Sequence, residues 1–282
     1  MARKTIAMLH PGEMGAAVGA CLVSAGHRVV WASAGRSAAT RARAGEAGLE
    51  DLVTLARAVA EAEFVFSICP PHGALELAAE IAELGFDGLY VDGNAISPDT
   101  AREVGARVEL SQARFVDGGI IGPAPFKAGT TSFYLSGPKA KDVAALFKGT
   151  FVTAIALDGP VGAASALKVC YAAWNKGSIA LLTAVRALAL HEGVDDALIG
   201  AWQKNVPDVA KRSEAITSQA RKAWRWIGEM DEIAGSFEAA GLPGGFHLAA
   251  ADIYGRLEDF KDAAKAPTMG EILDAVATGR PD

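Results

Sequence analysis

The stretch KTIAMLHPGEMGAAVGACLVSAGHRVVWAS, residues 4–33, decides the fold of the first part of the chain. A short apolar run, Lys4–Leu9, ends at a His-Pro-Gly turn, and small and apolar residues at helical spacing then fill Met14–Ala25. A second β-rich run, His27–Ser33, follows at once. The three segments have the order and length of one βαβ unit, so we expect a right-handed connection between two parallel strands.

The alternation of strands and helices continues to about residue 156. Helices are expected over Glu50–Ala62 and after Pro71, and strands over Glu63–Cys69, Gly88–Asp92, Arg114–Gly118, Thr131–Ser136 and Phe151–Ala156. Beyond Gly159-Pro160 the β-branched runs vanish, and Ala- and Leu-rich helical periods take over. The sequence therefore predicts an α/β fold, with a doubly wound Rossmann sheet in residues 1–158 and an all-α domain in residues 159–282.

The composition is that of a compact globular protein. The 282 residues include 27 Lys and Arg against 33 Asp and Glu, a net charge of −6, and no basic run stands out. Nucleic acid and anionic membrane surfaces are therefore disfavoured as partners, because affinity for polyanions comes from clustered cations. The most apolar stretch, Val161–Leu190, contains Lys168, Lys176 and Arg186, so we interpret it as a helix buried in protein rather than in a membrane.

The cysteines and the N-terminus favour a cytoplasmic protein. Cys21, Cys69 and Cys170 lie far apart, without the paired spacing of zinc ligands or thiol exchange, and fit reduced thiols. The apolar run after Lys4 is too short for a signal peptide. His191, Glu192 and His247 have no metal-ligand spacing, so no metal is assigned.

The turn after the first apolar run is a candidate phosphate site. Dinucleotide-binding turns read G-x-G-x-x-G, and this turn reads His10-Pro11-Gly12-Glu13-Met14-Gly15, with the second and third glycines present and histidine in the first position. Because it follows a strand and opens a helix, we expect these six residues to bind a cofactor pyrophosphate at the helix N-terminus. The alternative is a glycine-rich turn that binds nothing.

The end of the second strand indicates which dinucleotide is bound. A carboxylate there accepts from the ribose of NAD, whereas arginine accommodates the phosphate of NADP. No carboxylate occurs between His27 and Gly45, and that stretch instead carries Ser33, Arg36, Ser37 and Arg41. This hydroxyl and guanidinium set favours NADP over NAD. The alternative is that both arginines are only solvated surface charges.

Two further strand ends are candidate cofactor contacts. Cys69-Pro70-Pro71 follows one expected strand, and Asn94 follows another in the segment Asp92–Pro98. Ligands of doubly wound folds bind outside the carboxyl ends of the strands, so both segments are expected to face the cofactor. Either could equally be a proline-set turn without a ligand.

Taken in order, these segments resemble the 6-phosphogluconate dehydrogenase and β-hydroxyacid dehydrogenase superfamily, which also includes the imine reductases. The family's G-L-G-x-M-G is matched at Gly12–Gly15, and its proline-rich turn at Cys69–Pro71. Its substrate-contacting D-x-P-V-S-G-G corresponds to Asp117–Pro123, so the resemblance implies substrate contacts from Gly118, Gly119, Ile121 and Gly122. The helical tail is similar to a short branch with a phosphogluconate dehydrogenase-like C-terminal domain.

The family's catalytic segment G-x-x-x-x-x-K corresponds to Gly162–Lys168, so the resemblance implies that Lys168 protonates the substrate oxygen. Tyr171 and Asn175 follow at helical spacing on the same face, where either could orient the substrate or share the donor role. A desolvated ammonium can supply the proton that hydride transfer requires near neutral pH. Without the resemblance, a lysine whose stem packs on a neighbouring surface is the alternative.

The departures from the family pattern affect the expected substrate. Ile121 stands where the family has serine, and Ala172 stands where hydroxyacid dehydrogenases have asparagine. We therefore expect an NADP-dependent oxidoreductase acting on a small carbonyl or alcohol, with an imine reductase as the alternative within the enzymes and an NADP(H)-binding sensor as the alternative outside them. The apolar helix in Val161–Leu190 and the resemblance both imply a homodimer.

Overall fold

The computed structural model describes residues 2–261 and 263–279. The chain folds as two compact units that divide between Val169 and Cys170, inside the continuous helix α7 (Ala163–His191). The predicted boundary at residue 158 lies shortly after the last strand and stays a prediction.

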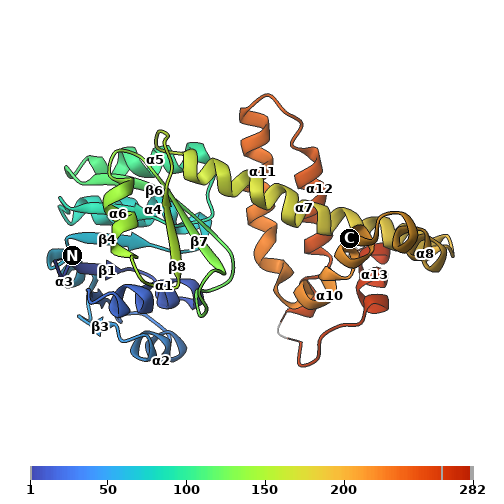
Figure 1. The fold of residues 1–282 in the computed structure, drawn as a ribbon, viewed down its shortest axis with the longest axis horizontal. Helices are drawn as coiled ribbons and strands as arrows, with labels where there is room; N and C mark the ends of the chain where they lie inside the picture. Colours follow the sequence, from blue (N-terminus) through green and yellow to red (C-terminus); the bar gives the residue numbers. More distant parts are fainter. Residues whose placement is uncertain (1, 262, 280–282) are drawn as a thin grey trace. The chain divides into compact units, whose positions relative to one another are not determined.

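The first unit is built on one eight-stranded sheet in the part of the chain described (Figure 1). The strands are β1 (Thr5–Met8), β2 (Arg28–Trp31), β3 (Glu50–Asp51), β4 (Phe64–Ser67), β5 (Leu89–Asp92), β6 (Arg114–Ile121), β7 (Thr131–Ser136) and β8 (Val152–Ala156). Their order is β3-β2-β1-β4-β5-β6-β7-β8, and β1 to β6 are parallel, while β7 runs antiparallel to β6. The doubly wound sheet and the parallel β1–β2 pair are thus confirmed.

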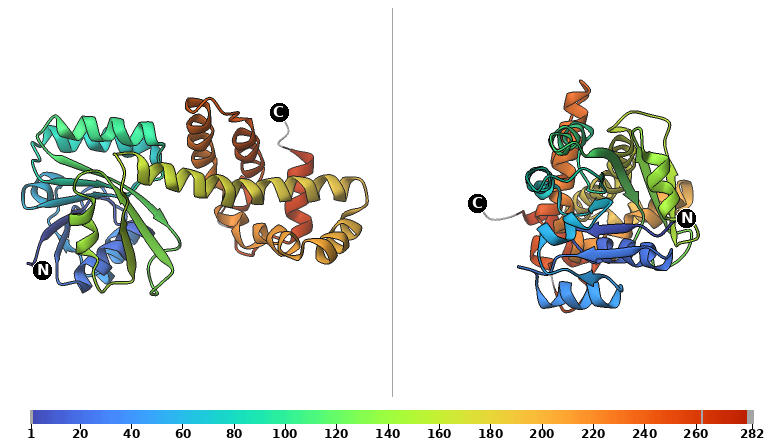
Figure 2. Two further views of the ribbon diagram at one scale, coloured as in Figure 1. Left: turned by 45° about the horizontal axis from the view of Figure 1, so that its top comes forward. Right: turned by 90° about the vertical axis from the view of Figure 1, so that its left-hand side faces the viewer.

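Helices cover both faces of this sheet (Figures 1 and 2). They are α1 (Glu13–Ser24), α2 (Ala38–Glu46), α3 (Leu55–Ala60), α4 (Ala74–Glu83), α5 (Pro98–Glu109) and α6 (Ala140–Leu146). Successive side chains of a strand point to opposite faces. Accordingly Ile6 and Met8 join one buried cluster with α1 and α6, whereas Ala7 joins another with α4 and α5.

Two expected elements have other bounds. The helix predicted over Glu50–Ala62 begins only at Leu55, because Glu50 and Asp51 pair with β2 as the short strand β3. Thr54 then caps α3 by accepting a hydrogen bond from the Arg57 amide. The strand predicted to end at Gly118 continues to Ile121, since pairing with β7 extends it.

The second unit is all-α in the residues described, as predicted. Besides the rest of α7 it contains α8 (Asp195–Asn205), α9 (Pro207–Ser213), α10 (Ala215–Gln219), a 3-10 turn (Ala220–Trp226), α11 (Ile227–Ala239), α12 (Gly245–Gly255), a second 3-10 turn (Glu258–Phe260) and α13 (Met269–Thr278). α11 and α12 form a helical hairpin (Figure 2). Proline or glycine stands at or shortly before the first residue of α9 (Pro207), α12 (Gly245) and α13 (Met269).

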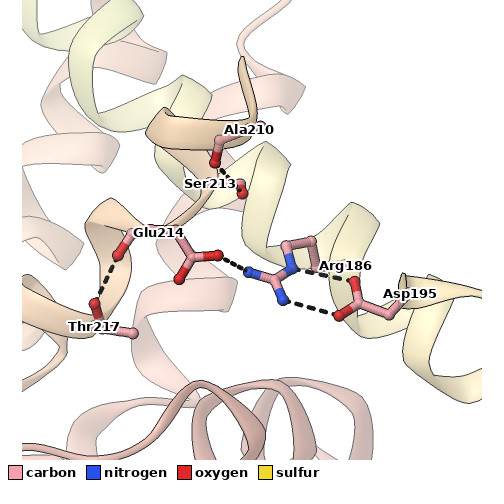
Figure 3. Close-up of polar contacts among 6 residues, drawn as sticks. All are labelled: Arg186, Asp195, Ala210, Ser213, Glu214 and Thr217. Atoms are coloured by element: carbon pink, nitrogen blue, oxygen red, sulfur yellow. Dashed lines mark hydrogen bonds and ion pairs between the residues drawn. The ribbon is translucent and has the colours of Figure 1, made fainter. Parts of the chain in front are cut away.

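The C-terminal part of α7 is fixed by Arg186, which is buried (Figure 3). Its guanidinium donates to both carboxylate oxygens of Asp195, at 3.1 and 2.8 Å, and to Oε1 of Glu214 at 2.8 Å. Next to these ion pairs, Ser213 Oγ donates to the Ala210 carbonyl and Thr217 Oγ1 donates to the Glu214 carbonyl. One buried cation therefore ties α7 to the start of α8 and the end of α9.

Candidate active site

The predicted site residues of the first unit gather at one edge of the sheet. Because β1, β2, β4, β5 and β6 are parallel, the segments that follow them share the edge formed by the strands' carboxyl ends. These segments are His10–Gly15, Ser33–Ser37, Cys69–Pro71 and Asn94, and Gly118–Gly122 form the last residues of β6 and the first residue after it. The strand order changes direction between β1 and β4, which is where such folds bind ligands.

The turn after β1 has the close packing that a dinucleotide site needs. A Cβ atom on Gly15 would lie 2.2 Å from the His10 carbonyl oxygen, so only glycine lets α1 pack this tightly against the strand end. Around Gly12, by contrast, the position of a Cβ atom is open. The start of α1 therefore leaves room for a ligand at its N-terminal amides.

His10 is the least expected member of this turn. Its Nδ1 is buried and has no hydrogen-bond partner among the residues the structure describes. Burial, with a smaller contribution from Arg36, lowers the pKa of His10 to about 4, so the imidazole is neutral at ordinary pH. A buried ring nitrogen in a folded protein normally has a hydrogen-bond partner, and a polar ligand bound at this turn would supply one for His10. The turn fits the pyrophosphate of a dinucleotide.

The end of β2 carries both signs of charge. Ser33 is buried, and its carbonyl accepts a hydrogen bond of 3.4 Å from Arg41. The hydroxyl of Ser37 caps α2 by accepting from the Thr40 amide at 3.2 Å. The carboxylate of Asp51, which belongs to β3, accepts from the Ser33 amide at 3.2 Å. Asp51 is not part of the sequence that directly follows β2, and only the pairing of β3 with β2 brings its carboxylate beside Ser33.

Asn94 braces the ends of β4 and β5. Its Oδ1 accepts from the Cys69 amide at 2.6 Å, and its Nδ2 donates to Ser67 Oγ at 3.0 Å and to Asp92 at 2.7 Å. With both amide protons used, the Asn94 side chain has no further N–H to donate to a ligand. The predicted contact of Asn94 with the cofactor stays a prediction. Other atoms of the Asp92–Pro98 segment would have to donate to the cofactor in place of the Asn94 side-chain amide.

Asp92, at the end of β5, is a fully buried carboxyl group. It accepts a 2.8 Å hydrogen bond from the Asn94 amide in addition to the side-chain bond. Burial and, to a smaller extent, nearby Asp117 raise the pKa of Asp92 to about 7, against the opposing effects of the bonds from Asn94 and the charge of Lys168. Asp92 is therefore partly protonated near neutral pH.

Asp117 caps the start of α7, a role that the sequence did not reveal. Its Oδ2 accepts from the amides of Gly162, Ala164 and Ser165, each at 3.0 Å, and its Oδ1 accepts from Ser165 Oγ at 2.6 Å. Ser136 Oγ also donates to Oδ2, at 2.9 Å. The carboxylate thus fixes the first turn of α7, and with it the position of Lys168 in the second turn.

Lys168 lies where β5 and β6 end. A Cβ atom on Gly119 would lie 2.6 Å from the Ala164 carbonyl and 3.1 Å from the Lys168 Cβ, so this glycine lets α7 pack onto β6. The Lys168 Nζ donates to the Asn94 carbonyl at 3.4 Å. Lys168 and Asn94, which the sequence predicted independently, are thus brought together.

Tyr171 and Asn175 follow on α7 within the second unit. Tyr171 is half exposed. Asn175 is engaged by Arg212, whose guanidinium donates to its Oδ1 at 2.9 Å and to its carbonyl at 2.7 Å. Because the amide oxygen accepts from Arg212, its N–H groups are turned away from that guanidinium. Sequence spacing gave no signal for this contact.

In residues 2–261 and 263–279 the structure has no group of three or more His, Cys, Asp or Glu arranged to hold a metal ion. Over the same residues none of the helices combines the length and apolar character that a membrane span requires.

Two family models match parts of the chain. A family model described as the NAD binding domain of 6-phosphogluconate dehydrogenase matches residues 5–148, and a domain of unknown function, DUF1932, matches residues 189–257. A probable 3-hydroxyisobutyrate dehydrogenase of Mycobacterium tuberculosis is 33% identical over 177 residues, which are 59% of this chain and 57% of that protein. The match thus spans a little over half of the curated relative.

Two solved structures share the fold over nearly the whole chain. The Mycobacterium tuberculosis 3-hydroxyisobutyrate dehydrogenase with L-serine is 21% identical, with a TM-score of 0.74, over 98% of this chain and 99% of that one. A reductive aminase from Aspergillus terreus with NADPH and ethyl levulinate is 15% identical, with a TM-score of 0.58, over 97% and 99%. Since the family model covers just over half of the chain, the chain belongs to the family of the NAD binding domain of 6-phosphogluconate dehydrogenase.

Proposed function

We propose that the chain is an NADP-dependent oxidoreductase that transfers a hydride between nicotinamide and a small carbonyl or alcohol, with Lys168 as proton donor or acceptor. The carrying observation is that Lys168 donates to the Asn94 carbonyl at the edge of the sheet that also bears the Gly12 turn. The named relatives, which are dehydrogenases and reductases, support the same reaction class.

The cofactor would be held by three groups of residues. The backbone of His10–Gly15 would bind its pyrophosphate, Ser33, Arg36 and Ser37 its adenosine phosphate, and Cys69–Pro71 with Asn94 the remainder along the strand ends. When bound, the nicotinamide supplies or accepts the hydride. The preference for NADP rests on the cations after β2, and the NADPH named with the reductive aminase agrees with it.

Lys168 would serve the proton side of the reaction. Its Nζ donates a hydrogen bond to the Asn94 carbonyl, which directs the ammonium. Donation to the developing substrate oxygen, and recovery of the proton in the oxidation direction, is general acid and base catalysis. Tyr171 and Asn175, on the same helix face, would orient the substrate.

The substrate would contact the end of β6, at Gly118, Gly119, Ile121 and Gly122. Ile121 is partly buried and apolar where the resembling family has a serine hydroxyl. An apolar side chain there favours a bulkier and less anionic substrate. This observation supports the second candidate function, an imine reductase, and the fold shared with a reductive aminase is in accord with it.

The decisive experiment compares Lys168→Ala with the wild type. We expect turnover on a panel of β-hydroxyacids and cyclic imines with NADP(H) to fall by about 10²- to 10⁴-fold, the usual worth of a positioned proton donor. NADPH affinity, measured by fluorescence titration, should stay nearly unchanged. Lys141→Ala, which removes an exposed lysine of α6 in the same unit, is the matched control.

The same experiment separates the alternatives. If Lys168→Ala keeps its turnover, the assigned proton donor is wrong. If the wild type binds NADPH but turns over nothing in the panel, the chain is an NADP(H)-binding sensor. The better substrate class decides between the dehydrogenase and the imine reductase.

We further propose that the chain works as a homodimer in the cytoplasm. Trp174, Leu181 and Leu188 recur every seven residues on α7 and are 70%, 60% and 62% exposed, so one face of this helix is apolar and uncovered. A second copy would cover it, and light scattering should then give twice the chain mass of 29.1 kDa. The free thiols of Cys21, Cys69 and Cys170 support a reducing compartment.

A further inference from the structure

The corner where β2 and β3 end holds a carboxylate in a fixed place. Asp51 Oδ1 accepts from the Ser33 amide at 3.2 Å and from the Val53 amide at 2.8 Å. Ser33 is the residue at which dinucleotide folds recognise the adenosine ribose or its phosphate. An acid from another strand therefore lies beside the specificity position of β2.

The backbone at this corner is locked. Val53 has a φ of 69°, in the left-handed region that a β-branched residue rarely adopts. The conformation is held by hydrogen bonds from the Ala34 amide to the Val53 carbonyl, at 2.8 Å, and from the Leu52 amide to the Trp31 carbonyl, at 2.9 Å. Backbone strain of this kind persists only where the surroundings enforce it. The backbone that carries Asp51 and the Val53 amide is therefore fixed next to Ser33.

The charge of Asp51 is balanced locally. Partial burial opposes its ionisation, but the hydrogen bonds from Ser33 and Val53 and the charge of Arg41 prevail and lower the pKa of Asp51. It is therefore ionised at neutral pH. Arg41 also donates to the Ser33 carbonyl, so this guanidinium lies next to Asp51 rather than free to meet a ligand phosphate alone.

We propose that Asp51 is a specificity-determining residue that restrains the preference of this chain for NADP over NAD. The inference rests on the proposed function, in that a dinucleotide occupies the strand ends. A carboxylate beside the ribose repels the dianionic phosphate of NADP but can accept from the ribose hydroxyls of NAD. Arg36 and Arg41 act in the opposite sense. The preference for NADP is therefore smaller than the two arginines alone would produce.

The test is the variant Asp51→Asn. Its amide oxygen can still accept from Ser33 and Val53, so the corner keeps its shape and loses only the charge. Fluorescence titrations with NADPH and with NADH at fixed low ionic strength give the ratio of the two dissociation constants. We expect the ratio in favour of NADPH to rise about fivefold, as loss of one repulsive charge several ångströms from a phosphate implies.

Two further variants keep the outcome clear. Glu46→Gln removes the same charge from the exposed last residue of α2 and should leave the ratio unchanged. Arg41→Gln removes the opposing cation and should lower the ratio. Titration with 2′,5′-ADP against 5′-AMP isolates the phosphate from the nicotinamide end and should reproduce both shifts.

The inference is overturned if Asp51→Asn leaves the ratio unchanged or lowers it while the variant remains folded by circular dichroism. It is also overturned if Arg41→Gln raises the ratio. Failure of the proposed function looks different, because the wild type would then bind neither NADPH nor NADH.

Discussion

The two ends of α7 are held by buried charges of opposite sign and by different kinds of partners. At the start, the carboxylate of Asp117 accepts three backbone amides and two hydroxyls, all of them neutral groups. Near the other end, the guanidinium of Arg186 meets two carboxylates (Figure 3). Of these, the Asp195 side chain is 14% exposed and that of Glu214 is 56% exposed.

The two kinds of partners imply that the two ends of α7 respond differently to salt and pH. Amides at a helix N-terminus carry partial positive charge, so they stabilise Asp117 inside the protein without a counterion. Ion pairs that reach solvent are instead screened by salt and weaken when a partner is protonated. The end of α7 that carries Lys168 should therefore hold its place across solution conditions that loosen the other end.

The largest expected effect comes from Asp117→Ala. The change leaves the amides of Gly162 and Ser165 buried without their acceptor, while the Ala164 amide keeps Ser136 Oγ, and we expect a loss of about 3–5 kcal/mol in the free energy of unfolding. Urea unfolding followed by circular dichroism measures it. Ser165→Ala, which removes one donor, should cost only about 1 kcal/mol. A loss below that of Ser165→Ala would show that Asp117 does not anchor the helix.

A smaller loss, about 2–4 kcal/mol, is expected for Arg186→Met, which keeps much of the side-chain volume but leaves Asp195 largely buried and unpaired. The control Glu214→Gln should cost less than about 1 kcal/mol, because that carboxylate is mostly exposed. Repeating urea unfolding in 1 M NaCl should shrink the effect of Arg186→Met and leave that of Asp117→Ala in place. Equal salt effects at both ends would refute the contrast between them.

The smallest effect concerns Asp92, which lies opposite Asp117 in the β5–β6 register but is bonded through Asn94 rather than by a helix end. Its pKa of about 7 in the fold exceeds that of an unfolded aspartate, about 3.9. The fold therefore favours the protonated form, and the stability that Asp92 contributes is complete below about pH 4 and lost as the pH rises to 7.

Between pH 5 and pH 8 the wild type should accordingly lose about 2 kcal/mol more of its unfolding free energy than Asp92→Asn, which cannot ionise. Urea midpoints at the two pH values measure the difference. Asp87→Asn, an exposed acid of the same unit, should follow the wild type. Parallel curves for the wild type and Asp92→Asn would mean that Asp92 titrates as an ordinary carboxyl.

Local pattern was sufficient for much of the fold. The first βαβ unit was predicted with the correct pairing, because the apolar spacing of Lys4–Ser33 differs clearly between strand and helix. The change to an all-α second part followed from composition in the same way. The helix predicted over Glu50–Ala62 was wrong at its start, since pairing with β2 overrides the local preference of two acidic residues.

Local sequence pattern identified only part of the candidate site. Gly12, Asn94 and Lys168 could be singled out because each follows a strand or matches a family motif. Asp117 heads a family motif, but its role as the cap of α7 could not be predicted, because the amides that donate to it lie 45 to 48 residues further along the chain. The pairing of Asn175 with Arg212, 37 residues apart, is equally invisible to spacing. Partners that only tertiary packing brings together carry no local signal.

Because the hydrogen bonds of Asp117 join residues far apart in the sequence, they also determine where the chain can be divided without losing them. A piece ending at residue 158 would retain β6 yet discard the amides of Gly162, Ala164 and Ser165 that donate to this carboxylate. A piece that runs through Val169 keeps them all. Chimeras that exchange the helical half between relatives should therefore be spliced within α7, beyond Val169, rather than in the loop that follows the last strand.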